Sequence, residues 1–189
     1  MKSAIILHGR PSKEEYFNSD GSSPSNSHWL PWLQQQLIIN GVLTQTPEMP
    51  NAYLPVYEDW CKIFEQFKID KDTILVGHSC GAGFLLRWLS ENKISVGKVV
   101  LVAPWIDPTK KLQNDFFNFE IDKDLLHRVK EFCIFISKDD EKSIIDSVEI
   151  ITKNLPHVEV KWFEDKGHFT LGDMKTEKFP ELLDFILKR

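Results

Sequence analysis

The chain has 189 residues, of which 42% are hydrophobic and 27% are charged. This composition is typical of a folded globular protein, and the length fits a single domain over residues 1–189. The formal net charge of −5 argues against nucleic acid as the main partner, because binding to phosphates depends on an excess of Lys and Arg.

The cysteines and the apolar segments limit the cellular setting that we expect. Cys61, Cys80 and Cys133 have no CxxC spacing, which suits neither a disulfide framework nor a zinc site. The first apolar run ends at His8 and is too short for a signal peptide, and no stretch approaches the length of a membrane span. We therefore expect a cytoplasmic protein with no metal, no cofactor and no membrane partner.

Strand and helix patterns alternate along the chain, and several strands are apolar over almost their whole length. Strands of this kind are typical of parallel sheets that are covered by helices on both faces. The predicted class is therefore a doubly wound α/β domain of three layers. In chain order, we predict a strand at 3–8, a helix at 28–39, a strand at 42–46, a helix at 55–67, a strand at 73–78, a helix at 81–91, a strand at 99–103, a helix at 122–130, a strand at 132–137, a helix at 143–154, a strand at 158–163 and a helix at 179–188.

Two regions do not follow this alternation. Residues 11–27 are polar and rich in Ser, Gly and Pro, so we predict a loop there. Residues 104–121 combine prolines with aromatic residues and have no clear period, so we predict no helix or strand.

The most informative motif is "GHSCG" at residues 77–81, between a predicted strand and a predicted helix. The pattern G-x-S-x-G in this context indicates a nucleophile elbow, a sharp turn that exposes a serine, here Ser79, at the carboxyl end of its strand. A turn that is only structural would also use these small residues, and that alternative stays open. The glycine spacing matches neither a phosphate-binding loop nor a dinucleotide fingerprint.

A serine nucleophile needs a base and an orienting acid, and later loops offer both. The predicted strand at 132–137 is followed by Asp139, Asp140 and Glu141, any of which could supply the acid. The strand at 158–163 is followed by His168, the candidate base. These positions fit a shared site because open α/β sheets build their sites at the carboxyl ends of strands.

Two backbone N–H groups are needed to stabilise the oxyanion that develops during attack. One candidate is the N–H of Cys80, which follows the nucleophile. The other is the N–H of Arg10, in the "LHGRP" segment after the first strand, where Pro11 has no N–H to offer. The Cys80 thiol is an alternative nucleophile, although it lies one position beyond the tip of the elbow.

Taken together, these segments make the chain resemble the α/β-hydrolase superfamily, in particular small serine hydrolases related to retinoblastoma-binding protein nine and bacterial relatives. The matching segments are "ILHGRP", "HWLPWL", "LVGHSCGA", "LVAPW", "SKDD" and "DKGHF". The resemblance implies a six-stranded parallel sheet in the order 2-1-3-4-5-6 with no large lid. It assigns the nucleophile to Ser79, the acid to Asp140 and the base to His168. The chain has no L-x-C-x-E motif, so we do not expect the retinoblastoma protein as a partner.

The candidates for the substrate pocket are aromatic. Trp105 lies just beyond a predicted strand end, Phe169 follows His168, and Trp29 precedes a predicted helix. Each of these side chains could instead belong to the core. His8 and His78 flank motif glycines, and each could line the site or pack near the core.

The leading hypothesis is a serine hydrolase that cleaves small carboxylic esters, thioesters or amides through an acyl-enzyme. The partner would then be a small acyl substrate. Two alternatives stay open: a binding protein that has the hydrolase fold without turnover, and acyl transfer to an acceptor other than water.

Overall fold

The computed structural model describes residues 2–188 and is built around one six-stranded sheet. The strand order is β2-β1-β3-β4-β5-β6, and all neighbouring strands are parallel, as the resemblance predicted. The strands are β1 (Ser3–Leu7), β2 (Leu43–Gln45), β3 (Thr73–His78), β4 (Val96–Val102), β5 (Val129–Ser137) and β6 (Glu159–Phe163).

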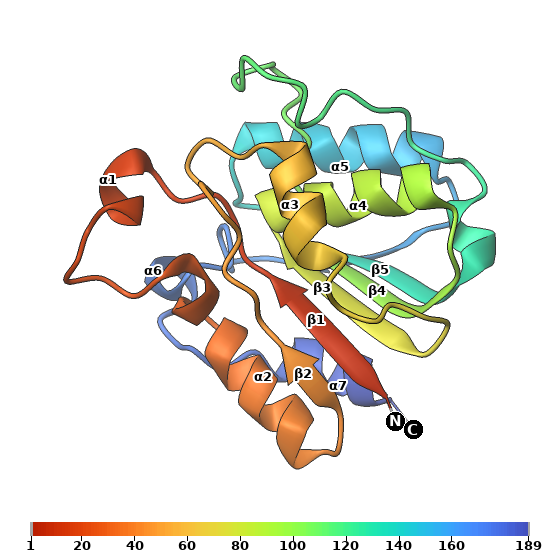
Figure 1. Ribbon diagram of the computed structural model, residues 1–189, viewed down its shortest axis with the longest axis horizontal. Coiled ribbons are helices and arrows are strands. Elements are labelled where there is room, and N and C mark those ends of the chain that lie inside the picture. The colour runs from red at the N-terminus through yellow and green to blue at the C-terminus, as the bar shows by residue number, and fades with distance from the viewer. Residues whose placement is uncertain (1, 189) are drawn as a thin grey trace.

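Helices cover both faces of the sheet and make the predicted three layers. α3, α4 and α5 lie on one face, and α2 and α7 lie on the other (Figure 1). The short helices α1 and α6 lie beyond the end of the sheet toward which β1 points (Figure 1). The helices are α1 (Lys13–Tyr16), α2 (Leu30–Ile39), α3 (Tyr57–Phe64), α4 (Cys80–Asn92), α5 (Lys142–Asn154), α6 (Leu171–Met174) and α7 (Pro180–Leu187). Two 3₁₀ turns complete the set, η1 (Pro24–Asn26) and η2 (Leu125–Arg128).

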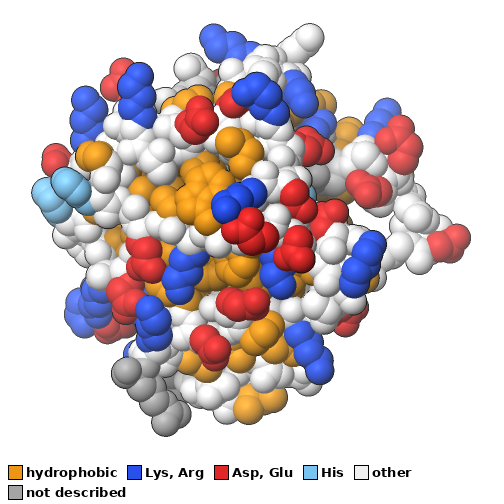
Figure 2. All heavy atoms as spheres, turned by 180° about the vertical axis from the view of Figure 1, so that it is seen from behind, with side chains coloured by type: hydrophobic (Ala, Val, Ile, Leu, Met, Phe, Trp, Pro, Cys, Tyr) orange, Lys and Arg blue, Asp and Glu red, His pale blue; other side chains and the backbone are white. Residues whose placement is uncertain are grey.

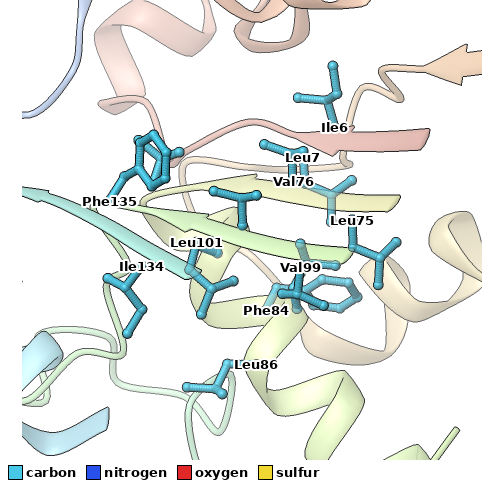
Figure 3. Close-up of a cluster of buried hydrophobic side chains, with 14 of the residues drawn as sticks. Ile6, Leu7, Leu75, Val76, Phe84, Leu86, Val99, Leu101, Ile134 and Phe135 are labelled. Carbon is cyan, nitrogen blue, oxygen red and sulfur yellow. The ribbon is translucent and has the colours of Figure 1, made fainter. Parts of the chain in front are cut away.

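The core lies on both faces of the central strands. Every residue of β3 is buried, and β4 and β5 are buried along most of their length. Figure 3 shows apolar side chains of these strands and of β1 gathered with Phe84 and Leu86 of α4. Burial on both faces explains why these strands are apolar throughout instead of alternating with polar residues.

The predicted helix at 122–130 is wrong. The structure has only the short turn η2 there, and β5 begins at Val129, which pairs with Val96. The Arg128 guanidinium donates hydrogen bonds to the backbone carbonyls of Ile94 and Leu89. Leu89 lies near the end of α4 and Ile94 lies between α4 and β4, so both are distant from Arg128 in the sequence. These tertiary contacts outweigh the local preference of residues 122–130 for a helix.

Residues 11–27 also hold more structure than the predicted loop. Ser12 caps α1 through a capping box, in which its hydroxyl accepts from Glu15 N–H and the Glu15 carboxylate accepts from Ser12 N–H. The spacing of Ser12 and Glu15 is the S-x-x-E pattern that predicts such a cap. Residues 104–121 contain no helix or strand, as predicted.

The back face of the molecule carries hydrophobic side chains near its centre, among charged side chains of both signs (Figure 2). Trp162 of β6 is the largest exposed apolar side chain and is 49% exposed. Within residues 2–188, every helix is too short or too polar to cross a membrane.

Candidate active site

Ser79 lies at the tip of a sharp turn between β3 and α4. Its backbone has φ 53° and ψ −118°, a conformation that non-glycine residues rarely adopt. Its N–H donates to the Val102 carbonyl at 2.9 Å, and its carbonyl accepts from Trp105 N–H at 3.1 Å. The strained residue is therefore held on both sides, by the last residue of β4 and by the segment that follows it.

The glycines of the motif allow β3 and α4 to approach closely. A Cβ atom on Gly77 would lie 2.6 Å from Cα of Ala82. A Cβ atom on Gly81 would overlap the His8 carbonyl, and one on Gly83 would overlap the Trp105 carbonyl. A side chain at any of these positions would force the backbone apart, which explains the cluster of small residues.

Three residues from separate loops form a chain of hydrogen-bonding distances. Nε2 of His168 lies 2.9 Å from Oγ of Ser79, and Nδ1 of His168 lies 3.0 and 3.1 Å from the two carboxylate oxygens of Asp140. The side chain of Asp140 is fully buried, whereas that of His168 is 27% exposed. The structure thus brings together the predicted nucleophile, acid and base.

The His168 backbone is held by three further contacts. The N–H of Gly167 donates to Asp139 at 2.9 Å, and the N–H of His168 donates to Asp173 at 3.0 Å. The His168 carbonyl accepts from Nε2 of His78 at 2.8 Å. With both backbone groups engaged, the ring of His168 is directed between Ser79 and Asp140.

Asp139 has a different environment from its neighbour Asp140. Its carboxylate accepts from Oγ of Ser137 at 2.5 Å and from Gly167 N–H. The Ser137 hydrogen bond is the main reason that the pKa of Asp139 is lowered. Oγ of Ser137 also accepts from Lys166 N–H at 2.9 Å. Asp139 therefore ties the loop after β5 to the loop of His168 and does not contact the imidazole.

The predicted oxyanion donors flank Ser79. Arg10 lines the same cavity as Ser79, and Cys80 begins α4 immediately after it. Within residues 2–188, the backbone N–H groups of Arg10 and Cys80 donate no hydrogen bond. Gly9 packs against Ser79, since a Cβ atom on Gly9 would lie 3.1 Å from Cβ of Ser79.

His8 holds the segment that carries Arg10. Its Nε2 accepts from Met49 N–H at 2.9 Å, so the ring proton is on Nδ1, which donates to the Gly9 carbonyl at 2.7 Å. The Gly9 carbonyl and the Arg10 N–H belong to the same planar peptide unit and point in opposite directions. Of the two options left open for His8, the structure selects the near-core one.

A cavity of about 480 Å³ opens beside Ser79 and His168. One wall is formed by residues of the 11–27 segment and another by Thr170 and Gly172. His28 and His78 also line it, which fits the site-lining option for His78. Burial lowers the pKa of both histidines, and the nearby His168 lowers them further. Both rings are therefore neutral at pH 7.

The three aromatic pocket candidates do not line this cavity. Trp29 and Phe169 are fully buried and pack against Phe179, which lies before α7. Trp105 is 7% exposed, and its ring packs edge-on against Phe117. These side chains instead fill the core next to the site, which is the alternative that the sequence left open.

Sequence reasoning missed His28 and the polar residues of 11–27. His28 has φ 59°, and its Nδ1 accepts from Leu171 N–H at 3.1 Å. The signal in the sequence that could have identified His28 is its position directly before "WLPWL". No local pattern shows that a residue preceding α2 meets the start of α6, 143 positions later.

The cysteines are free thiols in the described structure. Cys80 is buried, and burial raises its pKa well above its ordinary value, which disfavours the thiolate that a nucleophile requires. Within residues 2–188, His, Cys, Asp and Glu side chains form no group of three that could hold a metal ion.

Comparison with known proteins finds relatives over most of the chain. A family model described as serine hydrolase matches residues 19–186. The YdeN protein of Bacillus subtilis (strain 168) is 29% identical over 136 residues, which cover 68% of this chain and 72% of that protein.

Solved structures share the fold. The ydeN gene product of B. subtilis has a TM-score of 0.81 at 24% identity, with 98% of this chain and 97% of that chain covered. Est1E from Butyrivibrio proteoclasticus, solved with ferulic acid bound, has a TM-score of 0.63 at 11% identity, with 100% and 89% covered. The fluorophosphonate-binding serine hydrolase FphF of Staphylococcus aureus has a TM-score of 0.61 at 13% identity, with 100% and 84% covered. The family match spans most of the chain, and the protein therefore belongs to the serine hydrolase family.

Proposed function

We propose that this serine hydrolase cleaves small carboxylic esters, thioesters or amides through a triad of Ser79, His168 and Asp140. The observation that carries the proposal is the pair of contacts made by His168, at 2.9 Å to Oγ of Ser79 and 3.0 Å to Asp140. FphF, which shares the fold, is described as a fluorophosphonate-binding serine hydrolase. Because fluorophosphonate probes react with activated serines, this description favours the same chemistry for Ser79.

The buried Asp140 carboxylate accepts a hydrogen bond from Nδ1–H of His168 and so holds the imidazole in one tautomer. Nε2 is then unprotonated and accepts from the Ser79 hydroxyl. As Oγ attacks the substrate carbonyl carbon, its proton passes to Nε2. The N–H groups of Arg10 and Cys80 stabilise the negative charge that develops on the carbonyl oxygen.

The tetrahedral intermediate collapses when the bond to the leaving group breaks. His168 returns its proton to that group, which departs and leaves the acyl group on Ser79. A water molecule then attacks the acyl carbon while His168 takes a water proton. The bond to Oγ then breaks as His168 returns this proton to Oγ, which releases the acid and restores the Ser79 hydroxyl.

The test is labelling with a fluorophosphonate probe, read by intact mass. We expect one adduct on the unaltered protein and none on Ser79→Ala. Ser22→Ala is a matched control because Ser22 lines the same cavity, and this variant should label like the unaltered protein. A folded unaltered protein that takes no adduct, or a Ser79→Ala variant that still takes one, would overturn the proposed role of Ser79.

A further inference from the structure

Most of the residues that line the cavity beside Ser79 carry polar side chains. Among the described residues that line it, the side chains with polar groups outside the proposed triad include Arg10, Glu15, Asn18, Ser22, Ser27 and Thr170. The apolar side chains are those of Pro11 and Pro24. Small-molecule sites are usually lined mainly by apolar side chains, so this composition is informative about the substrate.

The lining offers an acyl chain few wholly apolar side chains, those of Pro11 and Pro24. A methylene group that leaves water stabilises a complex by about 0.8 kcal/mol when it meets apolar surface. The neighbouring Trp29 and Phe169, which would offer such a surface, are sealed in the core. Arg10 and Glu15 contribute one charge of each sign to the walls, which favours a neutral polar ligand.

His28 adds a hydrogen-bond donor to the residues that line this cavity. Its Nδ1 accepts from Leu171 N–H, so the proton of the neutral ring is on Nε2. Within residues 2–188, this Nε2–H makes no hydrogen bond. The positive φ of His28 is a strained conformation, and such strain persists in proteins mainly where the surrounding structure enforces it.

The place of His28 relates this donor to the leaving group. The ring of His28 lies 5.7 Å from that of His78, which in turn lies 5.1 Å from that of His168. His28 is also anchored to Leu171, three residues after the base. His28 thus lies near the base, the group that protonates the alcohol part of an ester as it leaves.

On the basis of the proposed hydrolase function, we propose that the substrates are short-chain acyl esters of neutral, hydroxyl-bearing alcohols, and that Nε2–H of His28 binds an oxygen of the alcohol. The polar walls solvate the remaining hydroxyl groups. His28 is thus a specificity residue. The bond cleaved is the one between the alcohol oxygen and the carbonyl carbon that Ser79 attacks.

The experiment compares glycerol 1-acetate with butyl acetate by release of acetate. Both are acetates of primary alcohols, so they differ mainly in hydroxyl groups. We expect kcat/KM of the unaltered protein to be about tenfold higher for glycerol 1-acetate, the ratio that one hydrogen bond supplies. Glycerol 1-octanoate should be the poorer substrate of the two glycerol esters.

His28→Asn removes Nε2–H while Asn tolerates the positive φ and offers an oxygen to Leu171 N–H. This variant should lower kcat/KM for glycerol 1-acetate about tenfold more than for butyl acetate. His157→Asn is the matched control, because His157 is exposed, and it should leave both values unchanged.

Equal or faster hydrolysis of butyl acetate would overturn the inference and leave the hydrolase standing, and so would equal losses for both esters in His28→Asn. Absence of hydrolysis of every ester, together with no fluorophosphonate adduct, would overturn the proposed function and this inference with it. The comparison of two esters on the unaltered protein stays decisive if His28→Asn fails to fold.

Discussion

The side of the cavity that carries Ser79 and His168 is held by hydrogen bonds to the backbone of both residues, whereas the side formed by residues 11–27 is mostly exposed. Ser79 is fixed through both of its backbone groups, and His168 is fixed through Asp173 and His78. Glycines without room for a side chain bring β3 and α4 together behind them.

Residues 11–27 make few hydrogen bonds to the rest of the molecule for their length. Ser25 N–H donates to Glu48 at 3.0 Å, and the Tyr16 hydroxyl accepts from Asn51 N–H at 3.2 Å. The difference matches what each side does in the proposed function. Bond making requires positions held to a fraction of an ångström, while a wall that contacts the substrate tolerates a looser structure.

The largest effect is expected on the side that carries Ser79 and His168. It is the difference in kcat between variants of two adjacent carboxylates, Asp140 and Asp139. Asp140→Asn should lower kcat by about 10⁴-fold, because Asn no longer holds the required imidazole tautomer. Asp139→Asn should lower kcat by no more than about tenfold, because both hydrogen bonds go to Oδ1 and the amide oxygen of Asn can accept them in its place. Steady-state kinetics on both variants measure the difference, and the reverse ranking would assign the acid to Asp139.

The next effect concerns stability on the two sides. Gly81→Ala should lower the free energy of unfolding by about 1–3 kcal/mol, because the new methyl group overlaps the His8 carbonyl. Gly21→Ala, in the exposed segment, should change it by less than about 0.5 kcal/mol. Its new Cβ atom would lie no closer than 3.4 Å to the neighbouring Asn18. Urea denaturation measures both, and equal losses would show that the two sides are packed alike.

A smaller effect is expected from pH. Burial lowers the pKa values of His8, His28 and His78 from the ordinary value of 6.5 in the folded protein. Below about pH 6.5 the unfolded chain therefore binds more protons than the folded one, so the free energy of unfolding falls as the pH is lowered. Urea denaturation between about pH 7 and about pH 5 measures this slope.

Two variants localise the pH effect. His78→Gln keeps a donor for the His168 carbonyl but does not titrate, so its slope should be flatter. The exposed His157→Asn should leave the slope unchanged. A slope in His78→Gln equal to that of the unaltered protein would contradict the assignment to buried His78.

The smallest effect is expected in the exposed segment. Tyr16→Phe removes the acceptor for Asn51 N–H and should raise KM about threefold with kcat preserved, because Glu15 and Asn18 beside it line the cavity. Tyr53→Phe is the control, since within residues 2–188 the Tyr53 hydroxyl makes no hydrogen bond. A loss of kcat in Tyr16→Phe would show that this segment positions the reacting groups.

Local patterns were sufficient for the framework of the site. The apolar runs and the small residues around Ser79 predicted the strands and the turn, because both depend on neighbours in the sequence. The order of the loops then identified His168 and a choice between Asp139 and Asp140, and the resemblance selected Asp140. The hydrogen bond between Asp140 and His168 agrees with that selection.

The tertiary structure alone decided which side chains face the cavity and where the local patterns fail. Trp29 and Phe169 lie next to site residues in the sequence, yet they fill the core, while His28 meets Leu171 from 143 positions away. The predicted helix at 122–130 gave way to β5 because pairing with β4 and the contacts of Arg128 outweigh local propensity. The spacing of small residues in the sequence determines the turn at Ser79. The walls of the cavity depend on contacts between distant segments, and the energies of such contacts cannot be read from a local pattern.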